Sequence, residues 1–365
     1  MSEPLMSAVV LLAVAVLLAG CTPPPPGPLP PMPPESGLRV MTFNVLGSQG
    51  DGNLFNEQAG WAARIDQLRP DVLVLQEAQN DDVAAVLDLT RTDYTLASYL
   101  QWECDLKPEQ EGVAILVRST LAVLDSGGTH VGESCLDPAV RRVLVWVDLD
   151  VEATPFRVYG THLTAGDGAS GESRDAQIRE IRKIVSDEDP SRERRWVVAG
   201  DVNAAPGTAS YDLLIHGDAG PSRTTPFVDT YAELSPAAAD AARCPVVAAD
   251  DVSGMQFLWD NPDHVGRCGY TAGWPKDANW LLCDVLSLCV SWDQRRITSV
   301  RGRVDMVLRA ENGPVAVHSA SVPNRTDGDW AVPGAAWYRL SDHLPYVVDL
   351  TIGSDVGPGS VLAGN

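Results

Sequence analysis

Short apolar runs that stop abruptly at a polar residue recur along this chain and limit what it can fold into. The clearest runs from residue 196 to 203: four apolar residues, a glycine, and then Asp201 and Asn203. Such a run is typical of a short buried strand. Because side chains two residues apart in an extended segment point the same way, Asp201 and Asn203 are expected to converge at the carboxyl end of this strand. A strand that runs into an ordinary Asp/Asn turn has the same pattern, so this run alone establishes no site.

Further strands and helices follow from the same kind of pattern. Strands are predicted over residues 38–44, 71–77, 112–118, 143–149, 156–162, 303–308 and 341–350, and apolar residues at helical spacing predict helices through residues 61–68, 83–87 and 178–185. Strands alternate with helices early in the chain and follow one another directly later. The economical architecture is an α/β fold in which two mixed sheets pack face to face with helices outside.

Polar residues at the ends of these strands are candidates for one functional site. Each has an ordinary explanation, such as a cap, a turn or a buried histidine. Together they are hard to explain that way, because carboxylates beside buried strands are costly unless a metal or a histidine neutralises them. The predicted site contains Asn44, Glu77, His162, Asp201, Asn203, Asp305, Asp342 and His343.

The composition restricts the function further. The chain has 365 residues and 45% hydrophobic content, enough to bury a full core. Its formal net charge is −22. A surface of that charge does not attract nucleic acid or anionic membranes at long range. A phosphate-bearing substrate would therefore need a bound cation or a local basic cluster.

The amino-terminal segment is a targeting signal rather than part of the fold. Residues 7–19 are apolar but short for a membrane span, and Leu18–Cys21 reads Leu-Ala-Gly-Cys. This resembles a bacterial lipoprotein signal, although no Lys or Arg precedes the apolar run; an ordinary signal peptide is the alternative. Residues 1–20 would be removed, Cys21 would be lipidated, and residues 21–37 would form a proline-rich spacer. The protein is expected to be an exported cell-envelope lipoprotein, anchored on the outer face of the membrane.

The other cysteines support export. Besides Cys21 there are six, an even number that suits an oxidising compartment. No Cys-x-x-Cys spacing is present, so a thiolate zinc site is not expected. Six cysteines allow fifteen pairings. Their order suggests Cys104–Cys135, Cys244–Cys268 and Cys283–Cys289.

An ordered set of motifs carries a family resemblance. Residues 42–44, 70–77, 160–163, 200–203, 304–305 and 341–343 resemble, in order, the motifs of the endonuclease/exonuclease/phosphatase superfamily. That group includes deoxyribonucleases, abasic-site nucleases, sphingomyelinases and inositol-polyphosphate phosphatases. The resemblance covers residues 38–352 and leaves 353–365 as a flexible tail. It implies a four-layer α-β-β-α sandwich and hydrolysis of a phosphate ester with Mg²⁺, or with Mn²⁺ or Ca²⁺.

The chemistry of the residue types, supported by the resemblance, assigns a metal-binding and a phosphate-binding part. Hard oxygen ligands suit Mg²⁺, so Glu77 and Asn44, and Asp342 for a second ion, are expected to hold the cation. His343 is expected to contact the phosphate. Asp305 would orient the His343 imidazole and keep it charged or correctly hydrogen-bonded.

The remaining candidates would act on water and the leaving group. Asp201 is expected to orient or deprotonate the attacking water, and Asn203 to donate to a phosphate oxygen. His162 would be a second phosphate contact or the leaving-group acid. Its expected carboxylate partner is Glu111, because a glutamate before a strand has that place in deoxyribonucleases. One of two arginines is also expected to reach the phosphate, and the sequence does not say which: Arg141 or Arg142.

The stretch between Asn203 and Asp305 is longer than in the family members that the chain resembles. We place an insertion at about residues 208–300, beside the site, where it would set specificity. Its tryptophans would stack bases, lie in a lipid interface or fill a disulfide-stapled subdomain, and the last role is favoured. They are Trp259, Trp274, Trp280 and Trp292.

Three functions remain open at this point. The favoured one is an extracytoplasmic nuclease or related phosphodiesterase, a monomer acting on nucleic acid, because secreted nucleases are a common use of this scaffold. A sphingomyelinase-like phospholipase C is suggested by residues 160–163 with the Gly166–Asp167 pair, and by the lipid anchor. A surface binding module without activity is the third.

Overall fold

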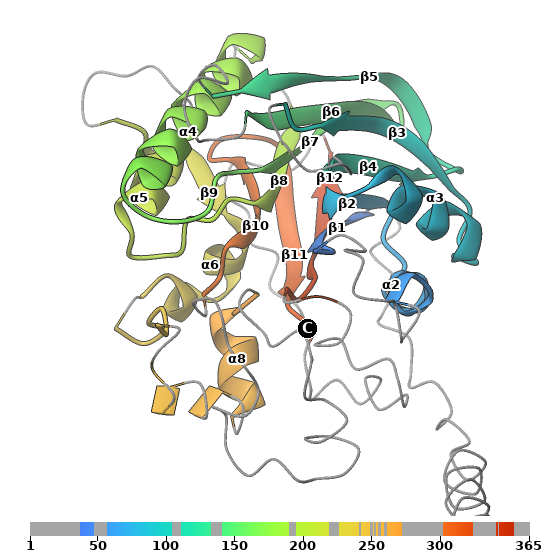
Figure 1. Cartoon of the computed structure of the whole chain (residues 1–365). Helices are drawn as coiled ribbons and strands as arrows, with labels where there is room; N and C mark the ends of the chain where they lie inside the picture. Colours follow the sequence, from blue (N-terminus) through green and yellow to red (C-terminus); the bar gives the residue numbers. More distant parts are fainter. Residues whose placement is uncertain are drawn as a thin grey trace, which may run out of the picture.

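Two mixed β-sheets lie face to face at the centre of the molecule, with helices on their outer sides (Figure 1). The computed structural model describes residues 37–46, 57–103, 111–132, 141–189, 195–218, 226–240, 242–248, 251, 253–254, 257–258, 261–271, 302–323, 341 and 343–353. The predicted α/β sandwich is confirmed. Each sheet has six strands.

The strands of each sheet come from distant parts of the chain. In the first sheet the order is β11 (Val315–Ser321), β12 (Tyr346–Ile352), β1 (Gly37–Asn44), β2 (Val72–Ala78), β4 (Gly112–Arg118) and β3 (Tyr94–Gln101). In the second it is β5 (Ala122–Val131), β6 (Arg142–Val151), β7 (Thr154–His162), β8 (Trp196–Asp201), β10 (Asp305–Ala310) and β9 (Phe227–Asp229).

One parallel pair in each sheet brings strand ends together. β1 is parallel to β2, and β7 is parallel to β8. A parallel pair needs a crossover, and here α2 (Glu57–Leu68) connects β1 to β2 while α4 (Ala169–Glu188) connects β7 to β8. The carboxyl ends of β1, β2, β7 and β8 are the ends that carry the predicted polar residues.

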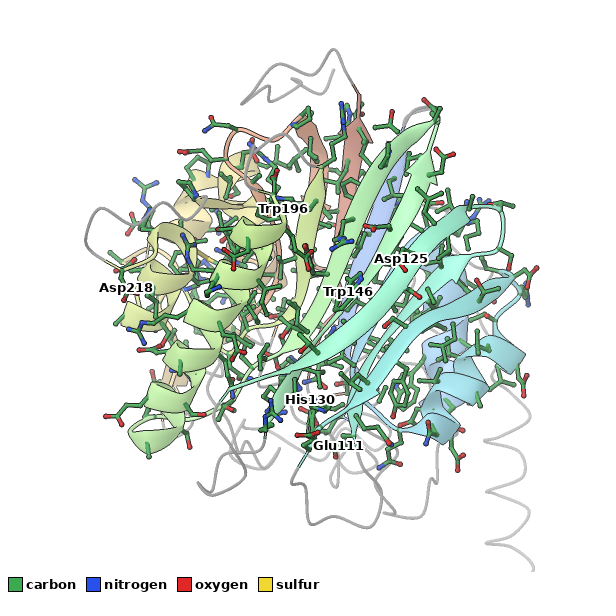
Figure 2. All side chains as sticks on the ribbon, turned by 90° about the horizontal axis from the view of Figure 1, so that it is seen from above. Glu111, Asp125, His130, Trp146, Trp196 and Asp218 are labelled. Carbon is green, nitrogen blue, oxygen red and sulfur yellow. A yellow bond between two sulfur atoms is a disulfide. The ribbon has the colours of Figure 1, made fainter. Side chains whose placement is uncertain are left out.

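Alternation along the strands builds the layers. In β8, Val197 and Ala199 point into the core between the sheets, whereas Trp196 and Val198 point outward onto α4 and α5 (Ala209–His216). Figure 2 shows Trp196 on this outer side. On the other side, α2 and α3 (Asn80–Leu89) cover the outward residues of β1, β2 and β4. The helices predicted through 61–68, 83–87 and 178–185 are therefore confirmed.

A glycine allows the two sheets to approach closely just before the site. Gly160 lies on the inner face of β7, two residues before His162. A Cβ atom at this position would lie 2.8 Å from Cγ1 of Val74 on the facing sheet. A larger residue here would push the sheets apart and separate the polar groups that each sheet contributes.

The sandwich includes part of the predicted insertion. α5 packs on the second sheet, and β9 pairs with β10. In the described remainder, α6 (Thr230–Leu234) lies beside β10 and β11 and is followed by a 3₁₀ helix (Pro236–Ala239), whereas α8 (Pro262–Cys268) lies beyond the end of the sheets in Figure 1. The predicted disulfide Cys244–Cys268 is present. The other cysteines and the insertion's tryptophans lie outside the described residues: Cys21, Cys104, Cys135, Cys283, Cys289, Trp259, Trp274, Trp280 and Trp292.

The predicted targeting segment also falls outside the described residues, which begin at residue 37. Among the helices of the described part, none is both long enough and apolar enough to cross a membrane.

Candidate active site

Strand register places three predicted residues side by side on the second sheet. His162 of β7 is paired with Asp201 of β8, and Asp201 is paired with Asp305 of β10. All three side chains are on the inner face, in line with core residues such as Ala199 and Val307. They are also buried, with exposed fractions of 3%, 1% and 0%. The end of the sheet therefore presents a histidine and two carboxylates to the facing sheet.

Asp201 is the centre of the site. Its Oδ1 accepts a hydrogen bond from the Asn203 backbone N–H at 2.9 Å, and its Oδ2 accepts one from Asn44 Nδ2 at 3.1 Å. The same Oδ2 lies 3.5 Å from Nε2 of His162 and 3.7 Å from Nε2 of His343. One carboxylate thus connects both sheets and faces two imidazole rings.

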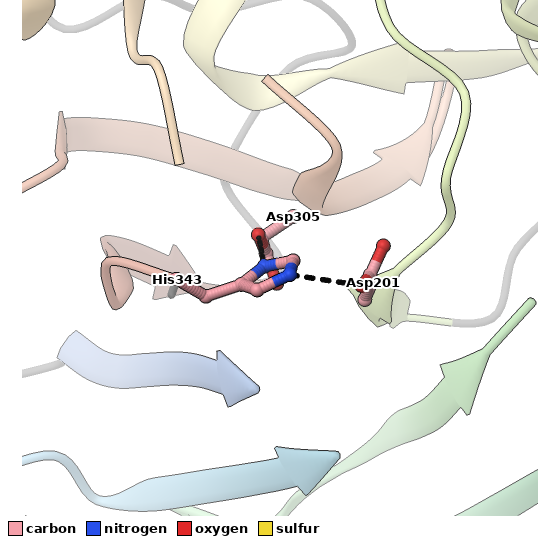
Figure 3. Close-up of side chains that lie close together, drawn as sticks. All are labelled: Asp201, Asp305 and His343. Carbon is pink, nitrogen blue, oxygen red and sulfur yellow. Dashed lines mark hydrogen bonds and ion pairs between the residues drawn. The ribbon is translucent and has the colours of Figure 1, made fainter. Parts of the chain in front are cut away.

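His343 and Asp305 form a buried pair (Figure 3). Nδ1 of His343 lies 2.7 Å from Oδ2 of Asp305, so the other ring nitrogen faces Asp201. Ser341 fixes the backbone of this segment: its hydroxyl donates to the Asn44 carbonyl at 2.6 Å and accepts from the His343 N–H at 3.0 Å. The imidazole is therefore oriented from both ends.

Glu77 enters the site through irregular backbone. Its φ is 54°, in the left-handed region, and the pairing of β2 with β4 shifts register between Gln76 and Ala78. A bulge of this kind re-aims a side chain that regular alternation would send elsewhere. Glu77 Oε1 accepts a hydrogen bond from Asn44 Nδ2 at 2.8 Å and lies 3.9 Å from Nε2 of His162.

His162 is held as a neutral ring. Burial, followed by the charges of Arg142 and His343, lowers the pKa of His162 well below its usual value. Asn203 Nδ2 lies 3.3 Å from His162 Nε2 and donates to the Leu163 carbonyl at 2.9 Å, which fixes the amide orientation. His162 Nδ1 is buried and has no hydrogen-bond partner in the described part of the chain.

Glu111 is buried, 1% exposed, at the same end of the sheets as His130 (Figure 2). No described residue forms a hydrogen bond with His162 Nδ1, and the expected pairing of Glu111 with His162 stays a prediction.

The two candidate arginines have different surroundings. Arg141 Nη1 donates to Glu103 Oε2 at 2.6 Å. The Arg142 guanidinium carbon lies 3.9 Å from the centre of the Trp102 ring, and Trp102 meets His162 edge to face at 5.3 Å. Of the two, Arg142 therefore lies beside the site. Trp102 was not predicted, because a single aromatic residue after a half-exposed strand gives no signal in the sequence.

The electrostatics of Asp201 suit a proton acceptor. Burial, and then the charge of Asp305, raises the pKa of Asp201 to about 6, while His343 and hydrogen bonds from Asn203 and Asn44 act in the opposite direction. At neutral pH the carboxylate is mostly ionised but more basic than an exposed aspartate. That is the property required of a general base.

The donor set fits a divalent cation. Asp201, Asp305 and His343 offer ligand atoms within 4.8 Å of one another, and Glu77 adds another carboxylate at the same end. Asp305 Oδ1 is buried and accepts no hydrogen bond from the described residues. Oxygen-rich, acidic surroundings of this kind suit Mg²⁺, Mn²⁺ or Ca²⁺.

The other two predicted metal ligands are Asn44, which lies in the site, and Asp342. Asn44 turns its amide nitrogen toward the carboxylates, and its Oδ1 accepts from the Leu46 N–H at 3.0 Å. In this arrangement it links the two sheets as a hydrogen-bond donor, and binding a cation through oxygen would require the amide to turn over. Asp342 lies outside the described residues.

The sequence matches the model of the endonuclease/exonuclease/phosphatase family over residues 41–343. The chain belongs to this family. Endonucleases, exonucleases and phosphatases all hydrolyse phosphate esters, and the family depends on divalent metal, in agreement with the acidic cluster described above. No curated protein matches the sequence.

Several solved structures share the fold of this chain but little of its sequence. An endonuclease/exonuclease/phosphatase protein of Bacteroides vulgatus is 18% identical, with a TM-score of 0.54 over 87% of this chain and 99% of that one. The mannosyl-6-phosphatase of Bacteroides thetaiotaomicron is 15% identical, with a TM-score of 0.52 over 86% of this chain and 99% of that one. The human nocturnin catalytic domain is 18% identical, with a TM-score of 0.52 over 88% of this chain and 97% of that one. At these identities the likeness concerns the fold alone.

Proposed function

We propose that this family member is a divalent-metal-dependent phosphodiesterase that acts outside the cytoplasm, with nucleic acid as the favoured substrate. The observation that carries the proposal is the placement of one Asp201 oxygen between two imidazole Nε2 atoms, at 3.5 Å from His162 and 3.7 Å from His343. A phosphate seated between these rings would have a base and a proton donor within reach. Such an arrangement suits in-line attack by water on phosphorus.

The role of each residue follows from whether its side chain can accept or donate a proton at neutral pH. Asp201, whose pKa is raised to about 6, accepts a proton from the attacking water at pH 7. His343 donates Nδ1–H to Asp305, whose carboxylate stabilises the ring when it is positively charged, and His343 Nε2 then binds a phosphate oxygen. Asn203 Nδ2 is placed to donate to an oxygen that gains charge in the transition state.

Glu77 would hold the cation, together with Asn44 once its amide has turned its oxygen toward the ion. When bound, the cation neutralises part of the charge on the phosphate and on the acidic site. His162 lies between Glu77 and Asp201 and is neutral, so it can bind a leaving-group oxygen without adding charge.

The charge of the site supports a diester substrate. Three carboxylates converge here, from Glu77, Asp201 and Asp305, and a nearby guanidinium comes from Arg142. A phosphodiester carries one negative charge, whereas a monoester carries about 1.5 to 2 at pH 7. The diester therefore meets less repulsion. The disulfide Cys244–Cys268 supports a place of action outside the reducing cytoplasm.

A substrate panel tests the proposal. Bis-p-nitrophenyl phosphate, p-nitrophenyl phosphate, duplex DNA, RNA, sphingomyelin and a phosphoinositide are each assayed with Mg²⁺, Mn²⁺, Ca²⁺ or excess EDTA. We expect the simple diester and a nucleic acid to be cleaved with metal and not in EDTA. Faster hydrolysis of the monoester than of the diester contradicts the proposal. Cleavage of sphingomyelin alone selects the phospholipase alternative, and inactivity throughout selects the binding module.

A further inference from the structure

Thr271 lies three residues after Cys268 of the disulfide. It forms hydrogen bonds with the backbone next to both members of the His343–Asp305 pair. Its side chain is fully buried, and its hydroxyl accepts the backbone N–H groups of Val304 at 3.1 Å and Asp305 at 3.0 Å. Its own N–H donates to the Gly302 carbonyl at 3.0 Å, and its carbonyl accepts the Leu344 N–H at 2.7 Å. One residue therefore holds the start of β10 and the residue that follows His343.

This double contact matters because nothing in the sheet pairing holds the two catalytic side chains together. Asp305 begins β10 in the second sheet, while His343 precedes β12 in the first. Their hydrogen bond joins residues 38 positions apart. Ser341 ties His343 to β1, and Thr271 ties the other side of His343 to the backbone of Asp305.

The segment Cys268–Thr271 is itself anchored at several points. Cys268 ends α8 and is bonded to Cys244. Two residues later the buried Tyr270 donates its hydroxyl hydrogen to the carbonyl of Pro245, the neighbour of Cys244. A covalent bond and a hydrogen bond thus fix the segment against residues 244–245, and Thr271 follows immediately.

The same segment packs against the residues that lead into β10. Gly269 has φ 66°, and a Cβ atom there would lie 2.8 Å from Cδ of Arg303 and 2.9 Å from Cζ of Tyr231. Arg303 is buried, two residues before Asp305, and its Nη1 forms an ion pair with Asp229 at 2.5 Å. The segment therefore has little freedom to move relative to the chain that carries Asp305.

From these contacts we propose that the disulfide-anchored segment Cys268–Thr271 positions the His343–Asp305 pair, with Thr271 as the positioning residue. The catalytic consequence rests on the proposed function, but the geometric claim does not. Without the hydroxyl, two buried N–H groups at the start of β10 lose their acceptor, and the Asp305 carboxylate shifts relative to the ring. The insertion then serves the catalytic geometry of the site as well as lying next to it.

The first test compares Thr271→Val, which keeps the shape but removes the acceptor, with Thr271→Ser, which keeps the acceptor. In the Val variant we expect kcat on the diester to fall by about tenfold to a hundredfold, the size of effect that small misplacements produce, with KM little changed. The Ser variant should restore most of kcat. Thr230→Val is the control for loss of a buried threonine hydroxyl: that of Thr230 contacts the Val307 carbonyl on β10 and the Tyr346 hydroxyl on β12, and it has no hydrogen bond to Asp305 or His343. We expect it to keep wild-type kcat.

The second test needs no substrate. The His343 ring ¹⁵N and ¹H signals, assigned by their loss in His343→Gln, are recorded at one fixed pH in the free protein. We expect Thr271→Val to shift or broaden them, and Thr271→Ser and Thr230→Val to leave them near their wild-type positions. If the wild type is inactive on every substrate, the proposed function fails while this measurement still decides the positioning role.

The double variant Cys244→Ala/Cys268→Ala keeps the threonine but removes its anchor, so it covers the case in which Thr271→Val does not fold. We expect it to shift the His343 signals in the same direction. Unchanged His343 signals in a folded Thr271→Val protein overturn the proposal. So do unchanged signals in the double cysteine variant, and so does a Thr230→Val protein that reproduces the Thr271→Val effect.

Discussion

Replacing Asp201 by Asn should abolish activity and yet make the metal-free protein more stable above neutral pH. The pKa of Asp201 is raised from 3.8 to about 6, first by burial and then by the charge of Asp305. The folded protein therefore binds more protons than the unfolded chain between these two values. Its free energy of unfolding falls as the pH rises through this window, and above it the full cost of the buried charge is present.

The size of the effect follows from the structure. The difference between about 6 and 3.8, at 1.36 kcal/mol for each pH unit, amounts to about 3 kcal/mol above pH 7. An amide at position 201 avoids this cost. In the wild type, however, Asn44 Nδ2 donates a hydrogen bond to Asp201 Oδ2 at 3.1 Å, and the N–H₂ group of the new amide cannot accept it. Losing that hydrogen bond costs about 1 kcal/mol. We expect Asp201→Asn to be about 2 kcal/mol more stable than the wild type above pH 7, and about 0.5 kcal/mol less stable at pH 4, where about half of the unfolded carboxyl groups are still ionised.

Urea unfolding in EDTA at several pH values between 4 and 8 measures this difference. Asp125→Asn is the matched control: Asp125 is exposed on β5 (Figure 2), so the same change of side chain should leave stability almost unaltered at every pH. Added Mg²⁺ should stabilise the wild type more than Asp201→Asn. A difference between Asp201→Asn and the wild type that does not vary with pH would refute the reasoning.

The remaining predictions concern catalysis and processing. His343→Ala should lower kcat by about 10²-fold or more while circular dichroism remains unchanged, because the ring acts chiefly in the transition state; full turnover in this variant would be a clear contradiction. Arg142→Ala should raise KM for the diester more than Arg141→Ala does, since Arg142 stacks on Trp102 beside the site while Arg141 pairs with Glu103; equal effects would exclude this difference in role. Intact mass spectrometry should find a diacylated Cys21 at the mature terminus, and an unmodified or different terminus would reject lipid anchoring.

The sequence predicted the part of the fold that carries chemistry, for a physical reason. Strands such as β2 and β8 are buried on both faces, so they appear as continuous apolar runs, and their ends are marked by a carboxylate. The outer strands lack this signal. β5 is mostly exposed and contains Ser-Gly-Gly, β3 is largely half-buried, and β9 is only three residues long. These strands form because neighbouring strands offer hydrogen-bonding edges, which no local pattern reveals.

The sequence also revealed only some of the residues of the site. Asp201 and His343 were visible because they interrupt or border apolar strands. Trp102 and Thr271 were not, because their importance comes entirely from tertiary contacts: one with His162, the other with the backbone of Asp305. The pairing of Glu111 with His162 was expected only from the resemblance to deoxyribonucleases, because no local pattern in the sequence connects these two residues.

Irregular backbone coincides with the site in a way that ties the fold to its chemistry. Glu77 and Asn203 have φ values of 54° and 48°, in a region that residues with a side chain rarely occupy, and such conformations cost on the order of 1–3 kcal/mol each. Asn44 Nδ2 holds Glu77, and the Leu163 carbonyl holds the Asn203 amide. Regular strands would end without bringing these two side chains around Asp201. The hydrogen bonds therefore maintain unfavourable backbone at the two points where strand geometry alone could not assemble the acidic centre.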